Sequence, residues 1–202
     1  MEKQPLFTPN QLEQICVSRL RDGIKNGFHK ELNLTEDQFM DSYNIAKQDL
    51  LSNIPSDGMP ALVEPRIPFF DQAKLLGLGI DPAIFTTPIM EYNKPYGVWL
   101  NIIQTTDSLV DPCEPFSSVM KKLPKEIRVA TPFEAISVGS PLLDQKPRFI
   151  VFPGGRTENH LPIVEGMSQV SLAFEEFLGE RRITYYYLNE YDGLGGLLVA
   201  QK

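Results

Sequence analysis

The chain has 202 residues, of which 42% are apolar, 22% charged and 10% aromatic, and this globular composition excludes a disordered or collagen-like chain. Its formal net charge is −7 at pH 7, so its averaged field repels phosphate backbones and anionic lipid surfaces. We therefore expect no nucleic acid and no membrane among its partners.

A capping box predicts the first helix, over residues 8–25. Thr8 is the expected N-cap, Pro9 occupies the first helical position and Gln11 closes the box. Apolar residues follow at helical spacing, and Cys16 is expected to face inward. The pattern is typical of an amphipathic helix that packs on the rest of the protein.

The same pattern returns at Thr35, with Gln38 closing the box, and predicts a second helix that runs to about Ser52. Residues 26–33, between the two helices, contain glycine and asparagine and are interpreted as a turn. We expect the two helices to pack as an antiparallel pair. The pair would form an extension over residues 1–54, and the sequence leaves open whether it is an independent domain.

A proline-rich connector is predicted over residues 55–87. Proline lacks an amide donor and biases its predecessor to an extended conformation, so no regular helix is expected through the first part. The prolines concerned are Pro55, Pro60, Pro65 and Pro68. A short helix over residues 71–76 is expected to end at the Gly77-Leu78-Gly79 turn.

From residue 88 to residue 202 the hydrophobic period changes towards 2, which is typical of strands. The strand candidates are residues 88–92, 97–104, 148–152, 161–165, 169–174, 183–188 and 197–201. Thr131 and Glu134 form a capping box for one helix among them, and residues 116–123 are a second helix candidate. We predict an α+β fold: an N-terminal antiparallel helix pair, then a mainly antiparallel β-sheet with one or two short helices.

Cysteine and histidine are both scarce in this chain. Cys16 and Cys113 lie far apart, and the first residues lack the basic and apolar stretches of a signal peptide, so we expect reduced thiols and a cytoplasmic location. The only histidines are His29 and His160, and no phosphate-binding loop or metal-ligand motif occurs. We therefore expect no metal and no cofactor.

The loop after the predicted strand at 148–152 gathers groups that can bind a ligand. Arg156, Glu158 and His160 place a cation, a carboxylate and an imidazole within five residues, after two glycines that can offer amides to an anion. Loops beyond strand ends commonly carry functional groups. These three residues are candidate ligand-binding residues, and a plain solvated loop is the alternative.

Tyr185 and Tyr187 are two further candidate binding residues. On a strand they share one face with Ile183, while Tyr186 and Leu188 point to the other. Both faces are therefore largely apolar. Either the strand is central and covered on both sides, or one face is an exposed aromatic platform for a partner.

Charge is distributed unevenly along the chain. A small basic cluster comprises Lys121, Lys122, Lys125 and Arg128, whereas residues 157–180 contain five glutamates and no lysine or arginine. Such patches can pair with each other, with a second copy of the chain or with an external partner. Ordinary solvated faces are the alternative.

Three function classes are compatible with these observations. The absence of catalytic signatures, the aromatic strand and the segregated charge favour a non-catalytic binding or protein-interaction module, which would engage a protein partner or self-associate. The second class is a small hydrolase or transferase that uses the loop from Arg156 to His160. The third is an acidic inhibitor or immunity-type protein that binds a basic partner, for which the charge of −7 would steer association. We predict the first and assign no catalytic residue.

Overall fold

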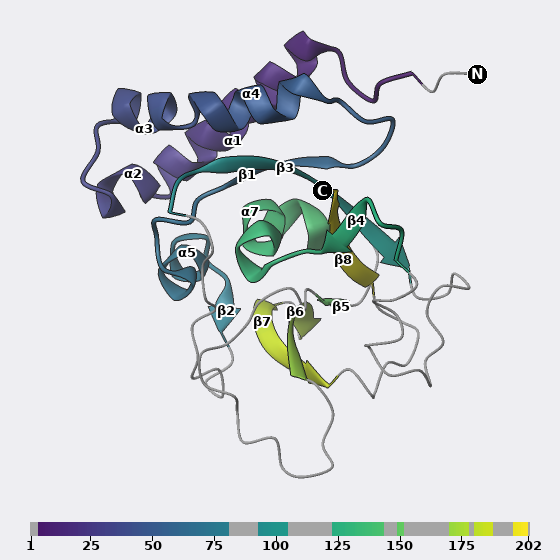
Figure 1. The fold of residues 1–202 in the computed structure, drawn as a ribbon. Helices are drawn as coiled ribbons and strands as arrows, with labels where there is room; N and C mark the ends of the chain where they lie inside the picture. The colour runs from purple at the N-terminus through teal and green to yellow at the C-terminus, as the bar shows by residue number, and fades with distance from the viewer. Residues whose placement is uncertain are drawn as a thin grey trace.

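The computed structural model describes residues 4–80, 93–104, 123–143, 149–151, 170–177, 180–187 and 196–201. Within these ranges the fold is α+β, with helices and a mainly antiparallel sheet (Figure 1). The predicted strands at 88–92 and 161–165 and the body of the predicted helix at 116–123 lie outside the described residues.

The N-terminal segment holds four helices where the sequence predicted two. They are α1 (Pro9–Lys25), α2 (Phe28–Glu31), α3 (Glu36–Ser42) and α4 (Asn44–Ser52). Both predicted capping boxes are confirmed. The Gln11 amide N–H donates to Thr8 Oγ1 at 3.3 Å, and the Gln38 amide N–H donates to Thr35 Oγ1 at 3.2 Å. Each glutamine side chain in turn accepts from the backbone N–H of its cap, at 2.9 Å.

The predicted second helix is interrupted at Tyr43, which separates α3 from α4. The buried Tyr43 side chain donates its hydroxyl hydrogen to Glu64 Oε2 at 2.8 Å, and the preceding Ser42 hydroxyl donates to the Phe39 carbonyl at 2.7 Å. A short side chain that bonds to a backbone carbonyl competes with the regular helix ladder. The interruption therefore arises where a tertiary contact and a local hydrogen bond coincide.

The strands form one sheet whose order is β1-β3-β8-β5-β6-β7-β2, with β4 paired to β8. Their bounds are β1 Met59–Val63, β2 Gly79–Ile80, β3 Tyr96–Gln104, β4 Ile127–Val129, β5 Phe149–Val151, β6 Val170–Phe177, β7 Glu180–Tyr187 and β8 Gly196–Gln201. Two pairings are parallel, β2 with β7 and β5 with β8, and the others are antiparallel.

The predicted connector at 55–87 contributes two strands, β1 and β2, to this sheet, which corrects the expectation of a sheet drawn only from residues 88–202. Pro60 lies in β1 and pairs in register with Trp99. A proline cannot donate to a ladder, but it is tolerated at the outside of a sheet, and β1 is the last strand at one end of the order. The short helix α5 (Phe69–Leu75) is capped by Leu76 and followed by Gly77, whose φ is +67°. The domain boundaries stay a prediction.

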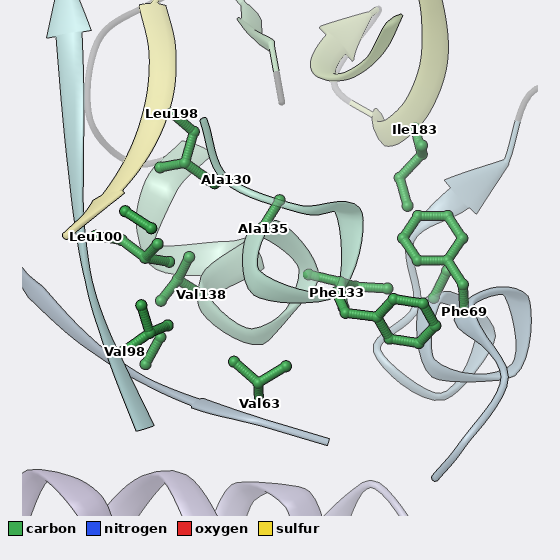
Figure 2. Packing of buried hydrophobic residues seen from close by; sticks show 14 of the residues in the cluster. Val63, Phe69, Val98, Leu100, Ala130, Phe133, Ala135, Val138, Ile183 and Leu198 are labelled. Atoms are coloured by element: carbon green, nitrogen blue, oxygen red, sulfur yellow. The ribbon is translucent and has the colours of Figure 1, made fainter. Parts of the chain in front are cut away.

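Strands β1 and β3 lie between two layers of helices (Figure 1). Helices α1 and α4 cover one face, and α7 (Pro132–Leu143) covers the other. Leu62 and Trp99 belong to the core on the side of α1 and α4, whereas Val63 and Val98 belong to the core around α7 (Figure 2). Alternate residues of the same strands thus serve two cores, as the period of 2 requires.

Helix α7 is the centre of the larger core. Its predicted capping box is confirmed, because Thr131 N–H donates to Glu134 Oε2 at 2.8 Å and Glu134 N–H donates to Thr131 Oγ1 at 3.2 Å. The ring of Phe133 packs edge-to-face against Phe69 of α5, with centroids 5.7 Å apart (Figure 2). Helices α5 and α7 are thereby held on the same side of β1.

Candidate functional site

A cavity of about 420 Å³ lies where the N-terminal helices meet α5 and α7. Residues of α1, α2, α3, α5 and α7 contribute to its wall, together with the end of β1. The apolar part of the wall includes Leu20, Phe28, Phe39, Leu62, Ile136 and Val138. The volume falls within the range of about 300–1,000 Å³ that is typical of small-molecule sites, which makes this cavity the candidate site.

Helix α1 lines the cavity through Arg19 and Gly23, and its C-cap Asn26 continues the same face at the spacing i, i+4 and i+7. Gly23 has no side chain, and a Cβ atom at that position would lie 3.5 Å from the ring of Phe39 and 3.9 Å from that of Phe28. Both rings line the cavity. The glycine therefore leaves open a space that a larger side chain would enter.

Arg19 is a half-buried cation in this wall whose hydrogen bonding is weak. Its Nη1 donates to the Ser137 carbonyl oxygen at 3.5 Å, which is its one hydrogen bond to the described residues, and none of their carboxylates lies within 4.0 Å of it. The residue four positions after Ser137 is Pro141, which has no N–H to donate to that carbonyl within α7. Burial lowers the pKa of the Arg19 guanidinium below its ordinary value.

Glu64, directly after β1, contributes a buried carboxylate to the same wall, and the charge of this carboxylate is paired with Arg66. Arg66 donates to it through Nε (2.8 Å, to Oε1), Nη2 (2.5 Å, to Oε2) and its backbone N–H (2.9 Å, to Oε1). Tyr43 adds its hydroxyl at 2.8 Å to Oε2. Both oxygens of Glu64 are therefore occupied by fixed donors.

This hydrogen-bonded group also shifts the ionisation of its members. Burial, followed by the charge of Glu64, raises the pKa of Tyr43 well above its ordinary value of 10.0. The hydrogen bond to Glu64 raises the pKa of Arg66. Tyr43 stays neutral and Arg66 stays charged over the physiological range.

Gln72 of α5 holds the adjoining chain by donating from Nε2 to the backbone carbonyls of Glu64 and Ile67, the latter at 2.8 Å.

The lining groups provide recognition rather than a nucleophile with its base. The ionisable residues of the wall are Arg19, Asp22, Lys25, Tyr43 and Glu64. No cysteine or histidine is among the described residues that line it, and the nearby Cys16 is a buried thiol whose pKa is raised by burial. A thiol in such surroundings is unreactive. The arrangement can hold a molecule with an apolar body and a polar end.

None of the site residues predicted from the sequence is among the described residues that line this cavity. Arg156, Glu158 and His160 lie outside the described residues. Tyr185 and Tyr187 lie on β7, where their backbones pair with Leu172 and Val170 of β6. Their side chains are not described, so the covered strand and the aromatic platform both stay predictions. His29, expected in a turn, is buried at the start of the chain's second helix, α2.

One residue of the predicted basic cluster, Arg128, forms an ion pair with Glu134. Arg128 donates to Glu134 Oε2 at 2.8 Å and to Oε1 at 2.5 Å, and Glu134 is fully buried. Tyr96 donates its hydroxyl to the same carboxylate at 3.2 Å, and burial raises the pKa of Tyr96. Arg128 thus stabilises the start of α7 through a side chain that is still 32% exposed, and the basic cluster stays a prediction.

Comparison with known proteins finds no matching family model, and no curated protein or solved structure with significant similarity. Over the described ranges, no group of three or more His, Cys, Asp or Glu side chains is placed to hold a metal ion. None of the helices described is both long and apolar enough to cross a lipid bilayer. The cavity is therefore interpreted from its own geometry.

Proposed function

We propose that the protein is a non-catalytic binding module whose ligand is a small organic molecule held in the cavity between α1, α5 and α7. The observation that carries this proposal is the cavity of about 420 Å³, whose wall combines apolar side chains with polar and charged ones. This combination is typical of sites that bury most of a ligand and orient it through a small number of hydrogen bonds.

The state of the ionisable groups supports binding over catalysis. A general base needs a free lone pair, but Arg66 and Tyr43 occupy both oxygens of Glu64. Tyr43 has a raised pKa and donates its hydrogen to that carboxylate, so it does not act as a base at neutral pH. The free, buried thiol of Cys16 suits a reducing compartment, and we propose the cytoplasm.

The binding module is tested by filling the cavity. A library of small organic molecules is screened for a rise in melting temperature, and the hits are titrated against wild type, Gly23→Leu and Gly23→Ala. We expect Gly23→Leu to abolish binding, because its side chain enters the space beside Phe39. Gly23→Ala is the matched control, since its Cβ makes only ordinary contacts at 3.5 Å.

Two results would contradict the proposal. One is a screen without a single hit, and the other is a set of hits that bind the folded Gly23→Leu variant as tightly as wild type. A product released from any hit by the wild-type protein, and not by Gly23→Leu, would instead make the cavity an active site.

A further inference from the structure

We infer that the ligand of the cavity is a monocarboxylate with an apolar body, and that Arg19 binds its carboxylate group. The inference rests on the proposed binding function and adds the chemical class of the ligand. It starts from one juxtaposition: a guanidinium with a single long hydrogen bond to the described residues lies in the wall of the cavity, beside the apolar side chains that line much of it.

Arg19 is poorly satisfied by the protein itself. A guanidinium offers five N–H donors, whereas Arg19 makes one hydrogen bond to the part of the chain that the structure describes, of 3.5 Å to the uncharged carbonyl of Ser137. A carboxylate accepts two parallel, charge-assisted hydrogen bonds from the same fork, each shorter and stronger than a neutral contact. A ligand carboxylate would therefore supply the charged hydrogen-bond acceptors that the half-buried guanidinium of Arg19 lacks among the described residues.

The other charges of the wall favour one negative charge on the ligand over two. Among the described lining residues, Arg19 and Lys25 bring two positive charges and Asp22 brings one negative charge, whereas the charge of Glu64 is paired with Arg66. One carboxylate neutralises the remaining positive charge, whereas a dianionic group such as a phosphate monoester exceeds it and is repelled more strongly by Asp22. An ammonium group would be repelled by Arg19 and finds the oxygens of Glu64 already occupied.

The apolar wall accounts for the rest of the ligand. Phe28 and Phe39 approach the cavity from the N-terminal helices, and Ile136 and Val138 approach it from α7. Burial of each methylene group in such surroundings favours binding. An alkyl or aryl body attached to the carboxylate is therefore recognised without further polar groups.

Four eight-carbon probes with different head groups separate these contributions. Octanoate, 1-octanol, octyl phosphate and octylamine are titrated at pH 8 into protein labelled on Ile, Leu and Val methyl groups, and the Ile136 and Val138 methyl signals report binding within the cavity. We expect octanoate to bind about 10- to 100-fold more tightly than 1-octanol, the range for a hydrogen-bonded charge. Octyl phosphate and octylamine should bind more weakly than octanoate.

Variants assign the preference to Arg19. Arg19→Met should remove the advantage of octanoate over 1-octanol while 1-octanol still binds. Arg21→Met is the matched control, because it removes the same charge from an exposed position of α1 that does not line the cavity. A second measurement on wild-type protein does not depend on the folding of Arg19→Met. The Nε–Hε NMR signal of Arg19 is assigned by its loss in Arg19→Lys, and it should shift on addition of octanoate but not of 1-octanol.

The outcomes distinguish this inference from the proposed function. If octanoate and 1-octanol bind equally, or if Arg19→Met keeps the preference, the carboxylate assignment is wrong and the binding module stands. Tighter binding of octyl phosphate that depends on Arg19 would replace the carboxylate by a phosphate ester. If none of the four probes shifts the Ile136 and Val138 methyl signals, this carboxylate class is overturned, whereas the library screen against Gly23→Leu decides the binding module separately.

Discussion

Gly97 of β3 lies directly against the carbonyl oxygen of Ala46 on α4: a Cβ atom at Gly97 would be 2.2 Å from that oxygen and 2.7 Å from Leu50 Cγ. Both distances are far below van der Waals contact, and the first involves backbone that cannot rotate away. The absence of a side chain at Gly97 therefore sets how closely the N-terminal helices approach the sheet.

Gly97→Ala should separate α4 from β3. Overpacking a core typically costs about 1–3 kcal/mol, and a clash with backbone is expected at the upper end of that range. The measurement is urea unfolding followed by the fluorescence of Trp99, the chain's single tryptophan, which is buried beneath the helices. An unchanged unfolding midpoint would mean that the helices do not dock on β3 in this way.

Gly23→Ala should have the opposite effect and stabilise the protein by about 0.5–1 kcal/mol. Glycine inside a helix is less favourable than alanine by this amount, and Gly23 lies within α1. The added Cβ would be 3.5 Å from the Phe39 ring, an ordinary contact. The same urea titration measures the gain. A loss of stability would show that the space beside Phe39 is smaller than described.

The helix starts could be predicted from the sequence because their determinants are local. Thr8 and Gln11 are three residues apart, and their two reciprocal hydrogen bonds depend on nothing else in the chain. The interruption at Tyr43 was not predicted, because its cause includes Glu64, which is 21 residues away. The strand at Pro60 was missed for a similar reason, since the position of β1 at one end of the sheet makes a proline tolerable.

The candidate site was beyond sequence analysis for the same physical reason. Arg19 on an amphipathic helix looks like an ordinary solvated cation, and its contact with Ser137 spans 118 positions. Two weak signals were present: a glycine inside the predicted helix at position 23, and a proline at position 141, four residues after Ser137. Neither indicates a cavity until the fold brings α1 and α7 together.

Glu64→Gln should destabilise the protein by about 3 kcal/mol or more, because it removes the charge that Arg66 pairs with and places amide hydrogens among donors. Tyr43→Phe should cost about 1 kcal/mol, since Arg66 still satisfies both carboxylate oxygens. Urea unfolding of both single variants and the double variant measures the coupling. We expect Tyr43→Phe to cost less in the Glu64→Gln background.

Exposed Glu13 on α1 provides the control for that series, because Glu13→Gln changes the net charge equally without touching a described partner. It should alter stability by less than about 0.5 kcal/mol. If Glu64→Gln were as mild as Glu13→Gln, the hydrogen bonds at Glu64 would not hold the end of β1 to α3. Additive effects of Tyr43→Phe and Glu64→Gln would mean that their hydrogen bond contributes nothing.

The raised pKa of Tyr43 predicts a loss of stability in alkali. Burial keeps the hydroxyl protonated in the folded protein, whereas in the unfolded chain it ionises near its ordinary pKa of 10.0. The folded state therefore binds more protons above pH 10, so the free energy of unfolding falls as pH rises, by about 1.4 kcal/mol per unit for this group. Below pH 10 its contribution is constant. Urea titrations at pH 8, 10 and 11 measure the slope of the free energy of unfolding against pH. The slope should be smaller for Tyr43→Phe than for wild type, and Glu13→Gln should have the wild-type slope. If the slope of Tyr43→Phe equals that of wild type, the Tyr43 hydroxyl ionises as readily in the folded protein as in the unfolded chain. That result would contradict the buried hydrogen bond from Tyr43 to Glu64.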